Sequence, residues 1–188
     1  MRKLLIIVLL YLFCSLPTIA EVVNKINISG NNRISEETIK IYGDIKVNEN
    51  YTAQDLNRIL NNLFSTNFFE DVQVDLSNNI LSINLIEHPV INQLIIIGET
   101  RNKYKDQIKK MIKSKEKDSY IKNNIAKDVD TIKQLYASLG HNFTEVDAKV
   151  RKVDNSNLDV IFEIKKGEPT RISKITFVGD KKVRDKRL

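Results

Sequence analysis

The side chains of this 188-residue chain that could serve catalysis or metal binding form no recognisable arrangement in the sequence. The two histidines, His88 and His141, stand far apart and without neighbouring ligand types, so they do not predict a metal site. No serine, cysteine or carboxylate is spaced so as to form a nucleophile with its base. Cys14 is the only cysteine, which leaves no disulfide framework. We therefore expect a non-enzymatic protein with no metal and no other cofactor.

The first twenty residues have the pattern of a secretory signal peptide. Arg2 and Lys3 form a basic start, and the apolar run Leu4–Phe13 follows. Small residues then precede a cut between Ala20 and Glu21. The alternative is an uncleaved membrane anchor, but the run is short against the roughly 20 apolar residues of a spanning helix. We expect residues 1–20 to be removed and the remainder to be exported.

A short strand-like segment that ends in glycine occurs three times. The copies are Ile26–Gly30, Leu94–Gly98 and Ile175–Gly179, and their glycines lie 68 and 81 residues apart. This spacing exceeds the roughly 20 to 50 residues of solenoid repeats and favours a string of small domains. Each glycine is expected to serve the turn into the following helix.

Residues 21–89 predict one unit of strand, helix, helix, strand and strand. Ser35 is a suitable N-cap for a short helix that ends at Gly43, and Thr52 for a longer one. An apolar stripe marks the longer helix at Leu56, Ile59, Leu60, Leu63 and Phe64. Alternation over 72–76 and 81–85 then predicts a hairpin with one buried face.

Residues 90–169 repeat that order. A helix with Ile108 on its apolar face precedes a longer one, capped by Asp118 or Ser119 and ending at Gly140. Alternating strands at 146–150 and 158–164 complete the unit. The predicted fold class is α+β, each unit being a three-stranded mixed sheet covered on one face by two helices. Residues 170–188 begin a third unit, so the chain is expected to continue.

Charge is distributed unevenly along the chain. Residues 21–89 carry 5 basic and 10 acidic side chains, whereas residues 90–169 carry 16 and 12. Within the second unit, Arg101–Lys133 holds 11 basic and 5 acidic residues. Such a run is either a solvated helix face or a contact with anionic lipid head groups or an acidic partner. Nucleic acid is not an expected partner of an exported protein.

Four segments carry a resemblance to a known family. They are Leu63–Val74 and Ile86–Ile91 around the end of the first unit, and Leu135–His141 and Gly167–Pro169 in the second. Together with the repeated order of elements, they make the chain similar to tandem POTRA (polypeptide-transport-associated) domains of the Omp85 family. The resemblance covers nearly all of residues 21–188. Asn67 stands where the family usually has glycine, and His141 where a tyrosine is more usual.

The resemblance implies a scaffold in the periplasm of a Gram-negative bacterium, held at the outer membrane before a C-terminal β-barrel that these residues do not include. Such domains receive unfolded outer-membrane proteins and dock lipoprotein subunits of the assembly complex and periplasmic chaperones. One alternative is a polypeptide transporter or autotransporter assembly protein of the same family. Another is a division-type periplasmic interaction module without a barrel.

The resemblance also implies where clients bind. In the family, the strand after the two helices lies at a sheet edge, where an extended client adds by β-augmentation. The corresponding edge residues here are Glu70, Asp71, Val72, Gln73, Val74, Asp75 and Leu76 in the first unit and Glu145, Val146, Asp147, Ala148, Lys149, Val150 and Arg151 in the second. Charges on such strands also limit unwanted edge-to-edge aggregation.

Overall fold

The computed structural model describes residues 21–175. The chain divides between His88 and Pro89 into two compact units. The expected signal peptide, with its cut after Ala20, and the third copy beyond Ile175 lie outside the described residues.

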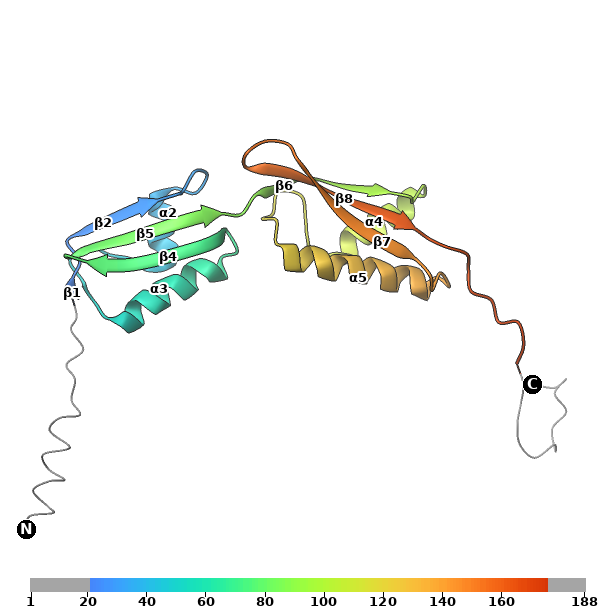
Figure 1. The fold of residues 1–188 in the computed structure, drawn as a ribbon, viewed down its shortest axis with the longest axis horizontal. Helices are drawn as coiled ribbons and strands as arrows, with labels where there is room; N and C mark the ends of the chain where they lie inside the picture. Colours follow the sequence, from blue (N-terminus) through green and yellow to red (C-terminus); the bar gives the residue numbers. More distant parts are fainter. Residues whose placement is uncertain (1–20, 176–188) are drawn as a thin grey trace, which may run out of the picture. The chain divides into compact units, whose positions relative to one another are not determined.

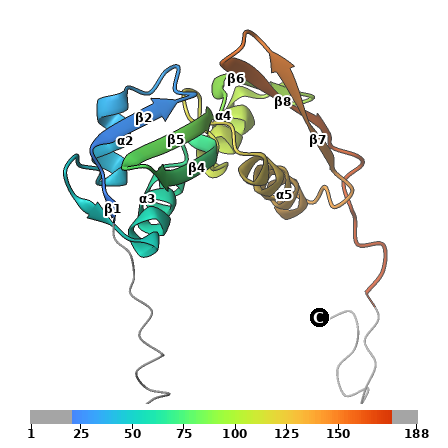
Figure 2. The same ribbon diagram turned by 60° about the vertical axis from the view of Figure 1, so that its left-hand side comes forward.

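The first unit is a three-stranded sheet with two helices on one face (Figures 1 and 2). Its strand order is β2-β5-β4, with β2 parallel and β4 antiparallel to the central strand β5. The elements are β1 (Glu21–Val22), β2 (Lys25–Ser29), α2 (Glu36–Gly43), β3 (Asn50–Tyr51), α3 (Ala53–Ser65), β4 (Phe69–Ser77) and β5 (Ile80–Glu87).

Helix capping in the first unit follows the sequence pattern. Ser35 Oγ accepts the Thr38 N–H at 3.2 Å, and Thr52 forms a capping box with Asp55. The α3 stripe buries Ile59 and Leu63 against the sheet. Tyr42, a residue of the apolar side of α2, remains half exposed and packs edge-on against Phe68, with ring centroids 5.8 Å apart.

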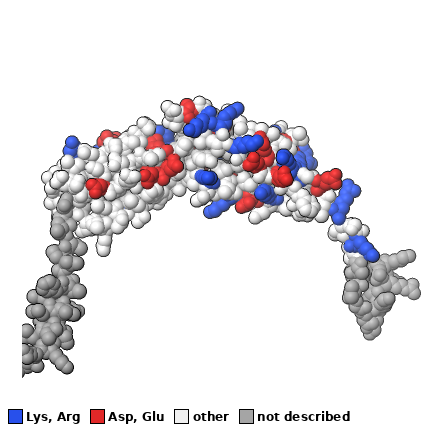
Figure 3. Space-filling model, viewed as in Figure 1, with Lys and Arg blue, Asp and Glu red and all other residues white. Residues whose placement is uncertain are grey.

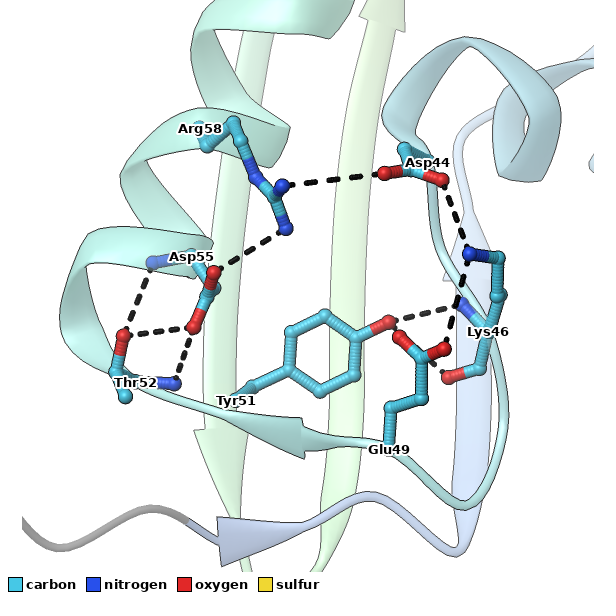
Figure 4. A network of polar contacts seen from close by, with 7 residues as sticks. All are labelled: Asp44, Lys46, Glu49, Tyr51, Thr52, Asp55 and Arg58. Atoms are coloured by element: carbon cyan, nitrogen blue, oxygen red, sulfur yellow. Dashed lines mark hydrogen bonds and ion pairs between the residues drawn. The ribbon is translucent and has the colours of Figure 1, made fainter.

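The loop between α2 and α3 is closed by a polar network (Figure 4). The buried Tyr51 hydroxyl accepts the Lys46 N–H at 2.8 Å and donates to the Lys46 carbonyl at 3.1 Å. Around it, Asp44 pairs with Lys46 at 3.5 Å, and Arg58 pairs with Asp55 at 3.2 Å. Two-residue strands β1 and β3 pair beside this loop. They are too short to leave a periodic signal in the sequence.

The second unit repeats the architecture, and its first strand is longer, with 8 residues against 5 in the first unit. Its strand order is β6-β8-β7, with β6 parallel and β7 antiparallel to β8. The elements are β6 (Val90–Ile97), α4 (Asn102–Met111), α5 (Lys122–Ser138), β7 (Glu145–Lys152) and β8 (Asn157–Lys165). Its core lies between the helices and the sheet, and Phe162, Ile132 and Tyr136 are fully buried.

The start of α5 corrects the predicted cap. The helix begins at Lys122, and Ile121 precedes it without a side-chain cap. Asp118 and Ser119 instead bond to the start of β6: the Ile91 N–H donates to the Asp118 carbonyl at 2.9 Å, and Ser119 bridges Val90. The preceding loop is anchored by buried Asp128, whose carboxylate accepts the backbone N–H groups of residues 113 and 114 at 2.6 and 3.0 Å.

The repeated glycines lie where the first strand of each unit meets the central strand. Gly30 and Gly98 have φ angles of +83° and +88°, which residues with side chains rarely adopt. A Cβ at either position would lie 1.9 Å from a carbonyl oxygen, that of Leu85 in the first unit and of Ile164 in the second. Beyond serving a turn, each glycine therefore permits a close approach of two backbones.

In the first unit, a carboxylate fastens the turn after the glycine to the end of the last strand. Glu87 accepts the backbone N–H groups of Asn32, Arg33 and Ile34 at 2.9, 3.0 and 2.9 Å. Its carboxylate also lies 3.6 Å from the Arg33 guanidinium. Three otherwise unpaired donors are thereby satisfied at the start of the segment that leads into α2.

In the second unit, the carboxylate comes from the turn itself. Buried Glu99 accepts the Arg101 backbone N–H at 2.9 Å, the Tyr136 hydroxyl at 2.7 Å and the Lys166 ammonium at 2.8 Å. Burial raises the pKa of Glu99, but the hydrogen bonds from Lys166, Arg101 and Tyr136 outweigh it and lower the pKa to about 2. Glu87 follows Leu85 by two residues, and Lys166 follows Ile164 by two residues; these are the residues whose carbonyls approach the glycines. The two units therefore carry opposite charges at matching positions.

The two departures from the family pattern are accommodated locally. Asn67 adopts φ +58°, a region that asparagine tolerates better than most residues. The His141 ring lies edge-on to Tyr136, with centroids 6.4 Å apart, and its Nδ1 is 3.2 Å from the Gly167 carbonyl oxygen.

The turn at Asn67 gives a direct test of this conformation. We expect Asn67→Gly to change the free energy of unfolding by less than about 0.5 kcal/mol, because both residues accept positive φ. Asn67→Val should cost about 1–2 kcal/mol, since a branched Cβ is disfavoured there. Thermal unfolding of the two variants measures the difference. Equal stabilities would show that the positive φ does not constrain the residue type.

Candidate functional site

The structure places both predicted strands at sheet edges. Residues 70–76 lie within β4 and residues 145–151 within β7, and each strand pairs on one side only. Of the opposite edges, β2 also has no strand on its outer side in the part of the chain that the structure describes, whereas the start of β6 is bridged there by Ser119 at Val90. Sequence reasoning did not name them, because alternation alone does not reveal which strand of a three-stranded sheet is central.

The hairpin turn between β4 and β5 determines which backbone groups of β4 face outward. Asn78 and Asn79 both have positive φ, +51° and +63°, as a two-residue type I′ turn requires. Such a turn closes on a hydrogen-bonded pair, Ser77 with Ile80, and antiparallel pairs then alternate along the ladder. The N–H and C=O groups of Val72, Val74 and Leu76 therefore point away from β5, toward the free edge.

Side chains of β4 alternate between the two faces of the sheet. Val72, Val74 and Leu76 face the helices; Val72 is buried, whereas the other two are only partly covered. The opposite face carries no helix and is called the open face below; it presents Asp71, Gln73 and Asp75. An added strand would thus meet an apolar row on one face and a polar, acidic row on the other.

Strand β7 has a different arrangement of charge on its open face. Glu145, Lys149 and Arg151 each pair with an oppositely charged residue of β8: Lys165 at 3.6 Å, Glu163 at 2.7 Å and Asp159 at 2.7 Å. The pKa of Asp159 is lowered, first by the hydrogen bond from Arg151 and then by the one from Asn92. The second sheet therefore neutralises most of its own edge charges.

The start of β4 is irregular. The register shifts between Phe69 and Asp71, so that Glu70 is an extra residue in the strand. Such a bulge bends an edge strand and limits the length over which another chain can pair. The regular part of the edge available for pairing runs from Asp71 to Ser77.

Part of the basic run in the second unit has a structural role. The Lys115 ammonium donates to the carbonyls of Lys109, Lys110 and Ile112, which lie at the C-terminal end of α4. Cations are favourable at that end of a helix. Lys109 also pairs with Glu116 at 3.1 Å. In Figure 3, Lys and Arg side chains gather over the second unit, whereas the first unit is largely free of them on this face.

Within residues 21–175 there is no cluster of three or more metal-binding side chains. None of the helices described in that range is sufficiently long and apolar to span a membrane.

Comparison with known families identifies the repeated unit. The family described as "POTRA: Surface antigen variable number repeat" matches residues 21–87 and again residues 89–167. The chain belongs to the POTRA family. The two POTRA matches coincide with the two β-α-α-β-β units of the structure, so the predicted α+β class with tandem domains is confirmed.

Two relatives of this POTRA chain are both outer membrane protein assembly factors. It is 27% identical over 179 residues to the outer membrane protein assembly factor BamA of Neorickettsia risticii, covering 94% of this chain and 24% of the relative. It is also 27% identical over 169 residues to BamA of Neisseria meningitidis, covering 88% and 21%. The chain thus spans about a quarter of the length of these relatives.

A solved structure supports the POTRA fold independently. The N-terminal domain of Omp85 from Thermosynechococcus elongatus aligns with a TM-score of 0.52 at 13% identity, covering 85% of this chain and 74% of that one. The expected resemblance to Omp85-family POTRA domains is confirmed by these comparisons.

Proposed function

We propose that this chain is the periplasmic scaffold part of an outer-membrane protein assembly factor. In this role it receives unfolded outer-membrane proteins on its sheet edges and docks lipoprotein subunits and periplasmic chaperones. Similarity to BamA over most of the chain supports the assembly role. Anionic lipid head groups are a further candidate partner for the basic surface of the second unit.

The observation that carries the proposed binding mode is the repeated edge strand. Each unit presents an antiparallel edge, β4 or β7, that has no pairing strand on its outer side among the described residues. Backbone pairing depends little on side chains, so one edge accepts clients of many sequences. A scaffold for diverse unfolded chains requires this tolerance.

Blocking one outward N–H tests the binding mode in the first unit. We expect Val74→Pro to reduce photo-crosslinking between a probe at Gln73 and an unfolded outer-membrane protein about fivefold, because proline removes a hydrogen-bond donor and crowds the added strand. The donors of residues 73 and 75 point toward β5, so the internal ladder stays intact.

Two controls separate pairing from other effects. Val74→Ala trims the side chain but keeps the N–H, and should crosslink nearly as well as the parent chain. Ala148 of β7 is the position that matches Val74: it lies opposite Phe162 of β8, as Val74 lies opposite Ile83 of β5. Ala148→Pro should therefore block the edge of the second unit and leave crosslinking at Gln73 unchanged. Undiminished crosslinking in a folded Val74→Pro chain would exclude augmentation at β4.

A further inference from the structure

The two edge strands differ in how their open-face charges are compensated. In β7, Glu145, Lys149 and Arg151 each have an oppositely charged partner on the neighbouring strand. The remaining charged residue of that row, Asp147, lies next to Lys149. The pKa of Lys149 is raised mainly by Glu163 and to a smaller extent by Asp147. The row therefore offers an added chain little unbalanced charge.

Strand β4 has no such compensation. Asp71, Gln73 and Asp75 lie opposite Ile86, Asn84 and Ser82 of β5, none of which is a cation. Within residues 21–175, neither Asp71 nor Asp75 makes an ion pair; the Asp71 carboxylate accepts only the Gln73 amide, at 3.0 Å. Both carboxylates therefore stay available to a chain that adds at this edge.

The rest of the open face does not supply the missing cations. The residues that β2 and β5 contribute to it are Lys25, Asn27, Ser29, Ile80, Ser82, Asn84 and Ile86. Lys25 is the only cation in this set, and it lies on the far edge strand opposite Ile80. The acidic row thus borders an uncharged surface of amides, hydroxyls and aliphatic groups.

The spacing of the row defines a complementary client. A side chain directly opposite in an added strand lies about 5 Å away, and Asp71 and Asp75 are roughly 13 Å apart along the strand. That separation exceeds the Debye length of about 10 Å at 0.1 M salt, so two cations four residues apart would act nearly independently. On the other face, the partly covered Val74 and Leu76 favour aliphatic side chains between them.

We propose that β4 selects extended segments in which Lys or Arg recurs at four-residue spacing among alternating apolar residues, whereas β7 does not select clients by charge. This inference rests on the proposed function, because it assigns a preference to the same edges. The first unit would then retain basic amphipathic strands and the second would accept neutral ones.

Binding of matched peptides tests the preference. Three labelled nine-residue peptides share one alternating apolar frame and carry Lys, Ser or Glu at two polar positions four residues apart. Fluorescence anisotropy measures their affinity for the chain carrying Ala148→Pro, which leaves β4 open. Opposite charges that face each other across strands attract, and the Lys peptide makes two such pairs, so we expect it to bind about fivefold more tightly than the Ser peptide. The Glu peptide should bind weakest.

Charge removal assigns the preference to the row. The double variant Asp71→Asn/Asp75→Asn should bring the Lys peptide to the affinity of the Ser peptide. The matched control Asp106→Asn/Asp130→Asn changes net charge equally at exposed positions of α4 and α5 and should keep the fivefold difference. Raising salt should also shrink that difference, since the contacts are solvent-exposed. In the Val74→Pro chain, where β7 is open, the three peptides should bind alike.

The outcomes distinguish the two proposals. If no peptide binds to any variant, augmentation fails and the charge preference falls with it. If all three peptides bind equally and Asp71→Asn/Asp75→Asn changes nothing, the edge is a binding site but the charge preference is refuted. A Lys preference that persists in the Asp71→Asn/Asp75→Asn chain would also refute it, because the selecting charge would then lie elsewhere.

Discussion

Replacing Gly98 by alanine is expected to destabilise the second unit by about 4 kcal/mol. The added Cβ would lie 1.9 Å from the Ile164 carbonyl oxygen, at φ +88°. The positive φ alone costs about 1–2 kcal/mol, and moving the central strand away from the new methyl group costs a further 1–3 kcal/mol. Hydrogen exchange at the amides of β8 measures the loss for this unit specifically.

Gly140 provides a matched control within the same unit. It has nearly the same φ, +89°, but nothing lies within 4 Å of a Cβ built there. Gly140→Ala should therefore cost only the conformational strain, about 1 kcal/mol. The difference between the two variants isolates the backbone contact. If both lose the same stability, the close approach to Ile164 contributes nothing.

The second large effect is expected from Glu99 and depends on pH. The pKa of Glu99 is about 2 in the folded protein, against an ordinary value of 4.5. Its ionised form therefore contributes stability that is complete above pH 4.5 and is lost as the pH falls toward 2. This difference of about 2.5 pKa units corresponds to roughly 3 kcal/mol. Glu99→Gln should destabilise the chain by about that amount at pH 7.

Denaturant unfolding between pH 7 and pH 2 checks this prediction. The stability curves of the parent chain and of Glu99→Gln should converge as the pH falls below about 4.5. Other carboxylates with lowered pKa values, such as Asp159, titrate in both proteins and cancel in the difference. Asp106→Asn, an exposed change on α4, is the control and should leave the stability at pH 7 nearly unchanged. A Glu99→Gln curve parallel to that of the parent chain would refute the assignment.

Much of the fold was predictable because periodicity and capping are local signals. The apolar stripe of α3 and the caps at Ser35 and Thr52 are read within a few residues, and the structure has them as predicted. The alternation in β4 and β5 likewise gave a hairpin with one buried face. The cap of α5 was predicted wrongly because Asp118 and Ser119 bond to the distant start of β6, which a local pattern does not reveal.

The candidate site was only partly predictable, since its properties depend on register. The edge position of β4 followed from the family resemblance, whereas the direction of the Val74 N–H required the turn at Asn78 and the pairing it imposes. Charge compensation in β7 depends on the register between β7 and β8, which places Glu163 diagonally across from Lys149. The contact between Glu99 and Lys166 joins residues far apart in sequence and had no local signal.

The opposite charges of Glu87 and Lys166 also bear on how two similar units fold next to each other. Tandem repeats risk pairing the strand of one unit with the turn of the other. If β5 took the place of β8 in the second unit, the Glu87 carboxylate would meet the buried carboxylate of Glu99. If β8 took the place of β5 in the first unit, the Lys166 ammonium would face the backbone N–H groups of residues 32–34, which need an acceptor. Each strand end thus suits only its own unit, and the charge mismatch disfavours an exchange of strands between the two units.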